Sequence, residues 1–223
     1  MRVLVGAETS GKVREAFRKM GHDAFSCDIL PADDNSPFHY QTDLIGLLES
    51  GLEWDLLIAH PPCTFLSNSG VRWLYRKGTR ERVEWRWAAL EAGARFFSAV
   101  LHARITKVAI ENPIQHKHAK RLIGVAPSQI IQPWQFGHKE MKATCLWLKG
   151  LPALRPTAIV GPPPRDAKAR RAWAVVHRLP PSAEHWKLRS ETYQGIADAM
   201  AAQWGQPQDP QDLFDLQLES SNP

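Results

Sequence analysis

An apolar run that ends at two consecutive prolines limits what this chain can fold into. Residues 56–59 are apolar throughout, which is typical of a strand buried on both faces of a parallel sheet. Pro61 and Pro62 follow, and because proline cannot donate a hydrogen bond to a sheet, the strand has to end there. We therefore expect Cys63 to stand at the carboxyl edge of the sheet, where open α/β folds bind their ligands.

Cys63 has two interpretations from its position alone, a buried structural cysteine and a nucleophilic thiol held on a rigid turn. A second apolar strand, predicted over residues 107–110, favours the nucleophile. It leads into Glu111, Asn112 and Pro113, so it also stops at a proline and brings a carboxylate to the same kind of edge. We interpret the two strand ends as one site that combines a thiol and a carboxylate.

The beginning of the chain has the pattern of a nucleotide-binding βαβ unit. A predicted strand over residues 2–7 and a helix over residues 12–20 are joined by the small polar turn Glu8-Thr9-Ser10-Gly11. A second strand over residues 24–27 leads to Asp28, and an acid at this place binds ribose hydroxyls in nucleotide-binding folds. The turn has fewer glycines than G-x-G-x-x-G requires, and capping of a turn is the alternative role for Asp28.

The rest of the chain alternates strands with helices, which favours a doubly wound α/β sheet. Asp43 precedes a short predicted helix over residues 44–49, and its local chemistry makes it an N-cap. No clear third strand stands out near residue 40. The other predicted elements are strands over residues 54–59, 128–134 and 145–148 and helices over residues 87–101 and 193–204.

Composition adds a few exclusions. The 223 residues are enough for one α/β domain with a sizeable core. No apolar run approaches the ~20 residues of a membrane span, and the N-terminus predicts a strand rather than a signal peptide, so we expect a cytoplasmic protein. The three cysteines are far apart, and His116 and His118 have no third ligand nearby, so we expect surface histidines and no metal site.

Residues 64–86, which we call the basic arm, combine basic and aromatic side chains. This combination suits nucleic acid, because cations contact phosphates and aromatic rings stack on bases. The alternative is a solvated helix whose tryptophans pack inward; we favour nucleic acid, in keeping with a net charge of +5. The side chains concerned are Arg72, Arg76, Lys77, Arg80, Arg82 and Arg86, with Trp73, Tyr75, Trp85 and the neighbouring Trp87.

The C-terminal third of the chain changes character. Residues 149–190 are punctuated by prolines and predict a small irregular segment, which could recognise a target. A basic run within it contains Arg165, Lys168, Arg170 and Arg171. We expect residues 1–148 and 191–205 to form the catalytic domain, and the polar residues 206–223 to be a disordered tail.

These parts suit one kind of chemistry. A thiolate can add to carbon 6 of a pyrimidine and make carbon 5 nucleophilic, provided that a hydrogen-bond donor or acid holds the charge that develops at ring nitrogen 3. Glu111 could be that acid, since its apolar neighbours favour a raised pKa. An electrophilic methyl donor lying over the βαβ opening would complete the reaction.

At this point the motifs resemble a known family. Pro61-Pro62-Cys63 resembles the Pro-Cys motif of DNA cytosine-C5 methyltransferases, and Glu111-Asn112-Pro113 resembles their Glu-Asn-Val motif, in particular in the short phage and prophage-type members. The resemblance covers residues 2–148 and 193–204. It implies a Rossmann-like S-adenosylmethionine-dependent methyltransferase fold that methylates carbon 5 of cytosine in DNA, with the target base flipped out under the loop that follows the cysteine.

The resemblance also implies roles for individual residues. Cys63 would be the nucleophile, and Glu111 would contact ring nitrogen 3 and the amino group of cytosine. Asp28 would bind the cofactor ribose and Asp43 the adenine, which overrides the N-cap interpretation of Asp43. The other predicted cofactor-binding residues are Glu8, Ser10, Gly11, Pro61 and Gln194, and the predicted substrate-binding residues are Ser67, Asn68, Arg72, Asn112, Lys142 and Thr144.

The sequence departs from the family pattern in four places. Glu8-Thr9-Ser10-Gly11 stands where the family has Phe-x-Gly-x-Gly, and Thr64 stands where glutamine is common. Residues 140–144 correspond to the Gln-x-Arg-x-Arg pattern, with Lys142 and Thr144 at the arginine positions. The recognition segment is also much shorter than the large domain that is normal in the family.

Three functions remain in view. The first is a DNA cytosine-C5 methyltransferase, and the second is an enzyme that modifies free cytosine nucleotides, which the short recognition segment suggests. A steep fall of affinity with salt would distinguish DNA from a free nucleotide. The third is a catalytically silent DNA-binding relative, suggested by the altered glycine turn. A folate enzyme like thymidylate synthase shares the cysteine chemistry, but the βαβ opening argues against it.

Overall fold

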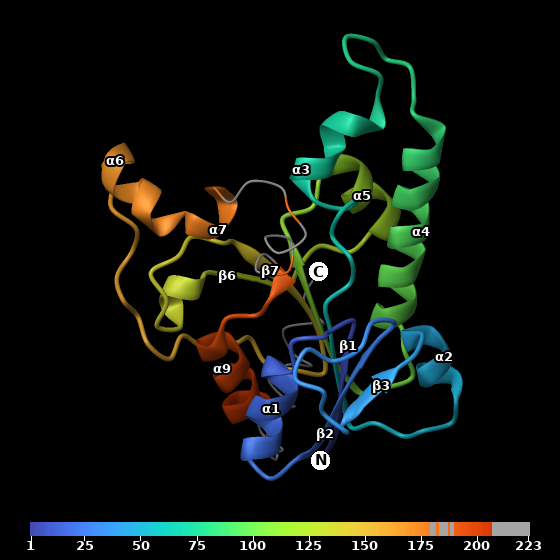
Figure 1. The fold of residues 1–223 in the computed structure, drawn as a ribbon, viewed down its shortest axis with the longest axis vertical. Coiled ribbons are helices and arrows are strands. Elements are labelled where there is room, and N and C mark those ends of the chain that lie inside the picture. The colour runs from blue at the N-terminus through green and yellow to red at the C-terminus, as the bar shows by residue number, and fades with distance from the viewer. Residues whose placement is uncertain (179–181, 183–186, 188–189, 207–223) are drawn as a thin grey trace, which may run out of the picture.

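A seven-stranded mixed sheet forms the centre of the protein (Figure 1), in the order β3-β2-β1-β4-β5-β7-β6. The computed structural model describes residues 1–178, 182, 187 and 190–206. β1 to β5 are parallel to one another, and β7 is antiparallel to both of its neighbours. The strands are β1 (Arg2–Gly6), β2 (Asp23–Asp28), β3 (His39–Gln41), β4 (Leu56–Ala59), β5 (Lys107–Pro113), β6 (Gln129–Ile131) and β7 (Thr144–Lys149).

Helices cover both faces of this sheet, because the buried strands are apolar on both sides. Figure 1 shows α2, α4 and α5 on one side and α1 with α9 on the other. In β4, Leu57 packs in the first layer and Ile58 in the second, as the period of two in a strand requires. The helices are α1 (Lys12–Lys19), α2 (Leu44–Glu49), α3 (Asn68–Val71), α4 (Glu84–Leu101), α5 (Lys117–Ile123), α6 (Ala167–Arg170), α7 (Val175–Arg178) and α9 (Gln194–Trp204), with 3₁₀ turns η1 (Arg72–Leu74), η2 (Pro133–Gln135) and η3 (Arg171–Trp173).

The predicted α/β fold is confirmed, and the differences are local. The strand predicted over residues 107–110 continues through Glu111 and Asn112 to Pro113, because antiparallel β7 pairs with these residues as well. β3 forms beside β2, although its residues gave no clear strand pattern. α3 and α5 were not predicted.

The strand order reverses between β1 and β4, and this reversal determines where on the sheet a ligand is expected to bind. From β1 the chain moves outward to β2 and β3, whereas from β4 it moves outward to β5 on the other side. In open α/β sheets ligands bind at the carboxyl ends of the strands at such a switch point. Pairing of Gly6 with Ala59 and of Ala59 with Ile110 sets the turns after β1 and β4 next to the last residues of β5.

The segment after β7 is irregular for much of its length. Leu151 and Leu154 are buried against the core, and neither helix nor extended strand forms before α6. The predicted tail, residues 206–223, lies outside the described residues except for Gln206. Within the described part of the chain, no helix is long and apolar enough to cross a membrane.

Candidate active site

Backbone and side-chain hydrogen bonds fix the turn that carries Cys63. The amide of His60 donates to the Gly6 carbonyl at 2.9 Å, and the Asn112 side chain donates to the Pro61 carbonyl at 2.7 Å. The Cys63 carbonyl in turn accepts from the amides of Leu66 and Ser67 at 3.0 and 2.9 Å. The turn is therefore tied to β1, to β5 and to its own continuation.

Cys63 is partly exposed at this edge, whereas Cys27 and Cys145 are buried. Burial, and then the negative charge of Glu111, raise the pKa of the Cys63 thiol, while Lys142 opposes the shift. The resting side chain is therefore the thiol, and it has to lose its proton before it can act as a nucleophile.

Glu111 lies in β5 beside the Cys63 turn and is paired with His60. Its Oε2 is 2.7 Å from His60 Nδ1, and both side chains are about nine-tenths buried. The Thr192 hydroxyl donates to the same oxygen at 3.4 Å. Because β4 and β5 are adjacent and parallel, His60 follows β4 at the level where Glu111 stands in β5.

The pKa of Glu111 is lowered, which contradicts the predicted raised pKa. Burial on its own would raise it, but the hydrogen bond and positive charge of His60, with Lys142 and Thr192, outweigh the burial. Burial lowers the pKa of His60, and the hydrogen bond and negative charge of Glu111, with Glu8, reverse the shift so that it is raised above the ordinary value of 6.5. The hydrogen bond and the two charges therefore favour the proton on His60 and the ionised form of Glu111.

The turn after β1 places another carboxylate at the switch point. Glu8 Oε1 accepts from the Ser10 hydroxyl at 2.9 Å and from the Val13 amide at 3.2 Å. Glu8 Oε2 is buried and has no hydrogen-bond partner among the described residues. Gly11 follows with a φ of +70°, where a Cβ would collide with the buried Arg14 guanidinium, so this position requires glycine.

The two predicted cofactor aspartates both have local hydrogen bonds. Asp28 ends β2, and its Oδ1 accepts from the Leu30 amide at 2.9 Å. Asp43 caps α2, and its Oδ2 accepts from the Gly46 amide at 2.7 Å. The N-cap interpretation of Asp43 is thus confirmed, and binding of ribose and adenine by these two side chains stays a prediction.

The predicted substrate residues divide by burial. Ser67, Asn112 and Thr144 are all under 10% exposed and bond within the protein, and their contact with a substrate stays a prediction. Asn68 and Arg72 are exposed at the start of the basic arm. Lys142 is half-buried, with its ammonium 3.3 Å from the Glu191 carbonyl.

The chain leading into α9 crosses the same edge. Lys12, just after the Gly11 turn, pairs with Glu191 at 2.6 Å, and Thr192 reaches Glu111. The Gln194 side chain bonds along its own helix to Asp198 at 2.8 Å, so its predicted cofactor contact stays untested. At Gly195 a Cβ would collide with the Phe136 carbonyl, so glycine lets α9 pack closely.

Some tryptophans in and next to the basic arm are exposed, as base stacking would require, and another packs inward. Trp73 and Trp85 are 51% and 60% exposed, while Trp87 is partly buried and donates to the Leu74 carbonyl at 3.0 Å. The Arg86 guanidinium lies 4.5 Å from the centre of the Trp85 ring. The exposed rings leave surface on which bases could stack.

Sequence reasoning missed two histidines at this edge. His60 was overlooked because nothing in the sequence near it indicates that Glu111 is its neighbour. His116 was predicted to be a surface residue, but it is buried: its Nδ1 caps α5 and its Nε2 donates to the Phe65 carbonyl at 2.8 Å. Within the described residues, no cluster of three or more histidines, cysteines or carboxylates could hold a metal ion.

The sheet order, with a candidate site at its switch point, is that of a Rossmann-like α/β fold, as predicted. No family model matches the chain, and no curated protein matches its sequence. Solved structures similar to it include several methyltransferases, and the chain spans about half the length of each.

Three of these structures illustrate the similarity. The methyltransferase EhMeth of Entamoeba histolytica is 15% identical, with a TM-score of 0.47 over 71% of this chain and 57% of that one. An E. coli prophage protein described as a DNA modification methyltransferase is 15% identical, with a TM-score of 0.46 over 71% and 51%. The Dnmt2 methyltransferase of S. pombe is 15% identical, with a TM-score of 0.37 over 69% and 51%.

Proposed function

We propose that this protein transfers a methyl group from S-adenosylmethionine to carbon 5 of cytosine in DNA through a covalent adduct on Cys63. One observation carries the proposal. The partly exposed thiol of Cys63 stands on a turn fixed by Asn112, and a paired carboxylate, Glu111, lies at the same sheet edge. A thiol beside a proton-carrying group is what addition to a pyrimidine ring requires.

The addition step can be written with the residues present. Cys63 loses its proton to solvent, and the thiolate forms a bond to carbon 6. The double bond between carbons 5 and 6 shifts to carbons 4 and 5, the electron pair of the double bond between carbon 4 and nitrogen 3 moves onto nitrogen 3, and nitrogen 3 takes a proton from the Glu111 side. Carbon 5 is then nucleophilic. After methylation, carbon 5 loses its hydrogen as a proton to solvent, and the double bond between carbons 5 and 6 forms again as the sulfur leaves carbon 6. The proton on nitrogen 3 returns to Glu111 and the Cys63 thiolate takes a proton from solvent, so the enzyme ends unchanged.

The turn after β1 fits the methyl donor. S-adenosylmethionine, when bound, supplies a methyl group on a positively charged sulfur, and its methionine end also carries an ammonium group. The unpartnered, buried Oε2 of Glu8 is an acceptor suited to such a cation, and the turn through Ser10 and Gly11 offers polar groups at the switch point. Asp28 at the end of β2 would accept from the ribose hydroxyls.

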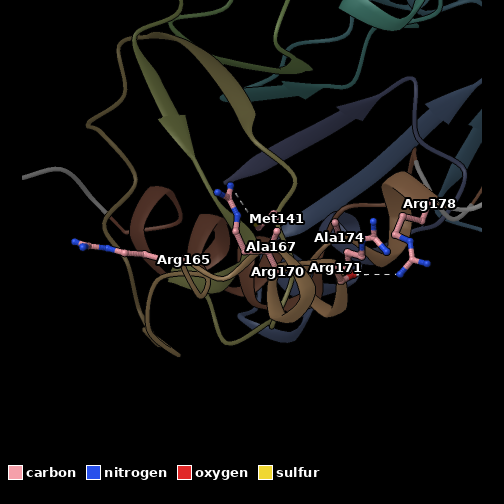
Figure 2. Close-up of a pocket in the computed structure, with 7 residues that line it drawn as sticks. All are labelled: Met141, Arg165, Ala167, Arg170, Arg171, Ala174 and Arg178. Atoms are coloured by element: carbon pink, nitrogen blue, oxygen red, sulfur yellow. Dashed lines mark hydrogen bonds between the residues drawn. The ribbon is translucent and has the colours of Figure 1, made fainter.

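Two exposed basic surfaces support DNA as the substrate. The first is the basic arm with Trp73 and Trp85. The second, which we call the arginine face, consists of Arg165, Arg170, Arg171 and Arg178 around a hollow of about 300 Å³. Figure 2 shows Arg165 and Arg178 at the two ends of this row of side chains, and Figure 1 shows α6 and α7 to the left of α3. Spread cations of this kind suit a chain of phosphates better than one free nucleotide.

Transfer of labelled methyl groups tests the proposal. Double-stranded DNA, single-stranded DNA and free deoxycytidine nucleotides are offered to the wild type, to Cys63→Ala and to the control Cys145→Ala, which removes a buried thiol. We expect 5-methylcytosine in DNA for the wild type and the control and none for Cys63→Ala, with circular dichroism confirming that each variant folds. Label in a folded Cys63→Ala, or label only in free nucleotides, would refute the proposal.

A further inference from the structure

One buried side chain at the site has no role in the reaction described so far. The backbone amide of His60 donates to the Gly6 carbonyl at 2.9 Å, which fixes the position of this residue. Its Nδ1 lies 2.7 Å from Glu111 Oε2, while its Nε2 is buried and has no hydrogen-bond partner among the described residues. A buried imidazole nitrogen without a partner is costly, so this arrangement calls for a function.

The proposed reaction poses a difficulty that His60 resolves. Ring nitrogen 3 of cytosine accepts a hydrogen bond, and a carboxylate has no proton to give it. In this protein the hydrogen bond and charge of His60 keep Glu111 ionised. Glu111 on its own would therefore repel the ring nitrogen to which it has to donate. The proton that the reaction needs lies one hydrogen bond further away, on the imidazole.

We propose that His60 and Glu111 act as one proton-storing pair, in which His60 holds the proton that Glu111 delivers to ring nitrogen 3; the inference rests on the proposed function. As Cys63 adds to carbon 6, the proton moves from Nδ1 to the Glu111 carboxyl group, and from there to the ring. His60 becomes neutral while nitrogen 3 holds the proton. When sulfur leaves, the proton returns by the same path and restores the imidazolium.

The charged groups around the pair favour this distribution of the proton. Glu8, in the turn after β1, and Glu111, in β5, both stabilise the imidazolium. Lys142, before β7, destabilises it and stabilises the carboxylate. Thr192, before α9, donates to Glu111 Oε2, and the remaining oxygen, Oε1, has no hydrogen bond within the described residues and is free to face a base.

His60 acts on the base only through Glu111, so it is a positioning residue. Because its ring titrates, its role should be visible in how the rate of methyl transfer depends on pH. In the wild type the single-turnover rate of methyl transfer should fall on the alkaline side as the pair loses its proton. His60→Asn keeps a hydrogen-bond donor but stores no proton, so only Glu111 remains to titrate. A carboxyl has a lower ordinary pKa than an imidazole, 4.5 against 6.5, so the alkaline limb should move to lower pH.

The rate measurement compares the wild type, His60→Asn and a control, His102→Asn, which changes a histidine at the end of α4. We expect His60→Asn to lower the single-turnover rate at neutral pH by about 10²-fold, a typical contribution of one proton-transfer group, with unchanged DNA affinity. The control should keep the wild-type profile. An unaltered rate and pH profile in His60→Asn would overturn the inference.

A second measurement needs no activity and therefore separates this inference from the proposed function. Nuclear magnetic resonance follows the titration of the His60 ring in the free protein, in Glu111→Gln and in Lys142→Met. We expect a His60 pKa above the ordinary value, a lower one in Glu111→Gln and a higher one in Lys142→Met. A His60 pKa that neither variant moves would overturn the pair, whereas a coupled pair in a protein that methylates nothing would overturn only the proposed function.

Discussion

The Cys63 turn and the arginine face are built in opposite ways. In the turn, Asn112, His116 and the amide of His60 each bond to backbone, and Glu111 is paired and about nine-tenths buried. On the arginine face, all four guanidinium groups are exposed, and none forms an ion pair within the described residues. The difference teaches that the groups proposed for bond making are fixed before substrate arrives, while the groups proposed for binding phosphates are left without carboxylate partners.

The largest effect on rate is expected in the fixed region. Glu111→Gln places an amide hydrogen-bond donor next to ring nitrogen 3 but has no proton to deliver, so the single-turnover rate should fall about 10²-fold or more. Glu49→Gln, which changes an exposed carboxylate at the end of α2, is the matched control and should leave the rate unchanged. A Glu111→Gln enzyme as fast as the wild type would break the comparison, because the fixed region would then contribute only shape.

A change of stability should also distinguish the two regions. Asn112→Ala leaves the buried Pro61 carbonyl without its donor, which should lower the free energy of unfolding by about 1–3 kcal/mol. Asn68→Ala, at an exposed position on the arm side of the same turn, should change it by less than about 0.5 kcal/mol. Urea denaturation of both variants checks this, and equal midpoints would show that the Asn112 bond does not stabilise the turn.

Much of the fold could be predicted because its signals are local. The apolar run before Pro61 and the one before Pro113 each predicted a buried strand and the edge of the sheet at which it ends. β3 escaped prediction because its three residues are stabilised by pairing with β2 and not by an apolar pattern of their own. α5 escaped because its N-cap is His116, and histidine is not among the usual capping residues.

The candidate site could be predicted in its chemistry but not in its electrostatics. Two proline-stopped strands were enough to bring Cys63 and Glu111 to one edge. The predicted direction of the Glu111 pKa shift was wrong, because local apolar neighbours suggested burial alone, whereas His60, at the end of the adjacent strand β4, pairs with Glu111. Such a partner is set by strand register, which a sequence reveals only once the order of the strands is known.

The smallest effect is expected on the arginine face. Removing Arg170 and Arg171 together should weaken DNA binding, and the plot of log affinity against log salt should become shallower by about 1 for each phosphate that the variant no longer neutralises. The single-turnover rate at saturating DNA should not change, because neither side chain belongs to the Cys63 turn. Lys19→Ala, an exposed cation at the end of α1, is the control, since α1 runs from the switch point toward the opposite edge of the sheet.

An unchanged salt slope in the double variant would mean that these arginines are a solvated surface, and the basic arm would then have to bind the phosphates. A reduced rate at saturating DNA would instead show that DNA recognition and methyl transfer are coupled. The arginine face and the Cys63 turn would then be less separate than their construction suggests.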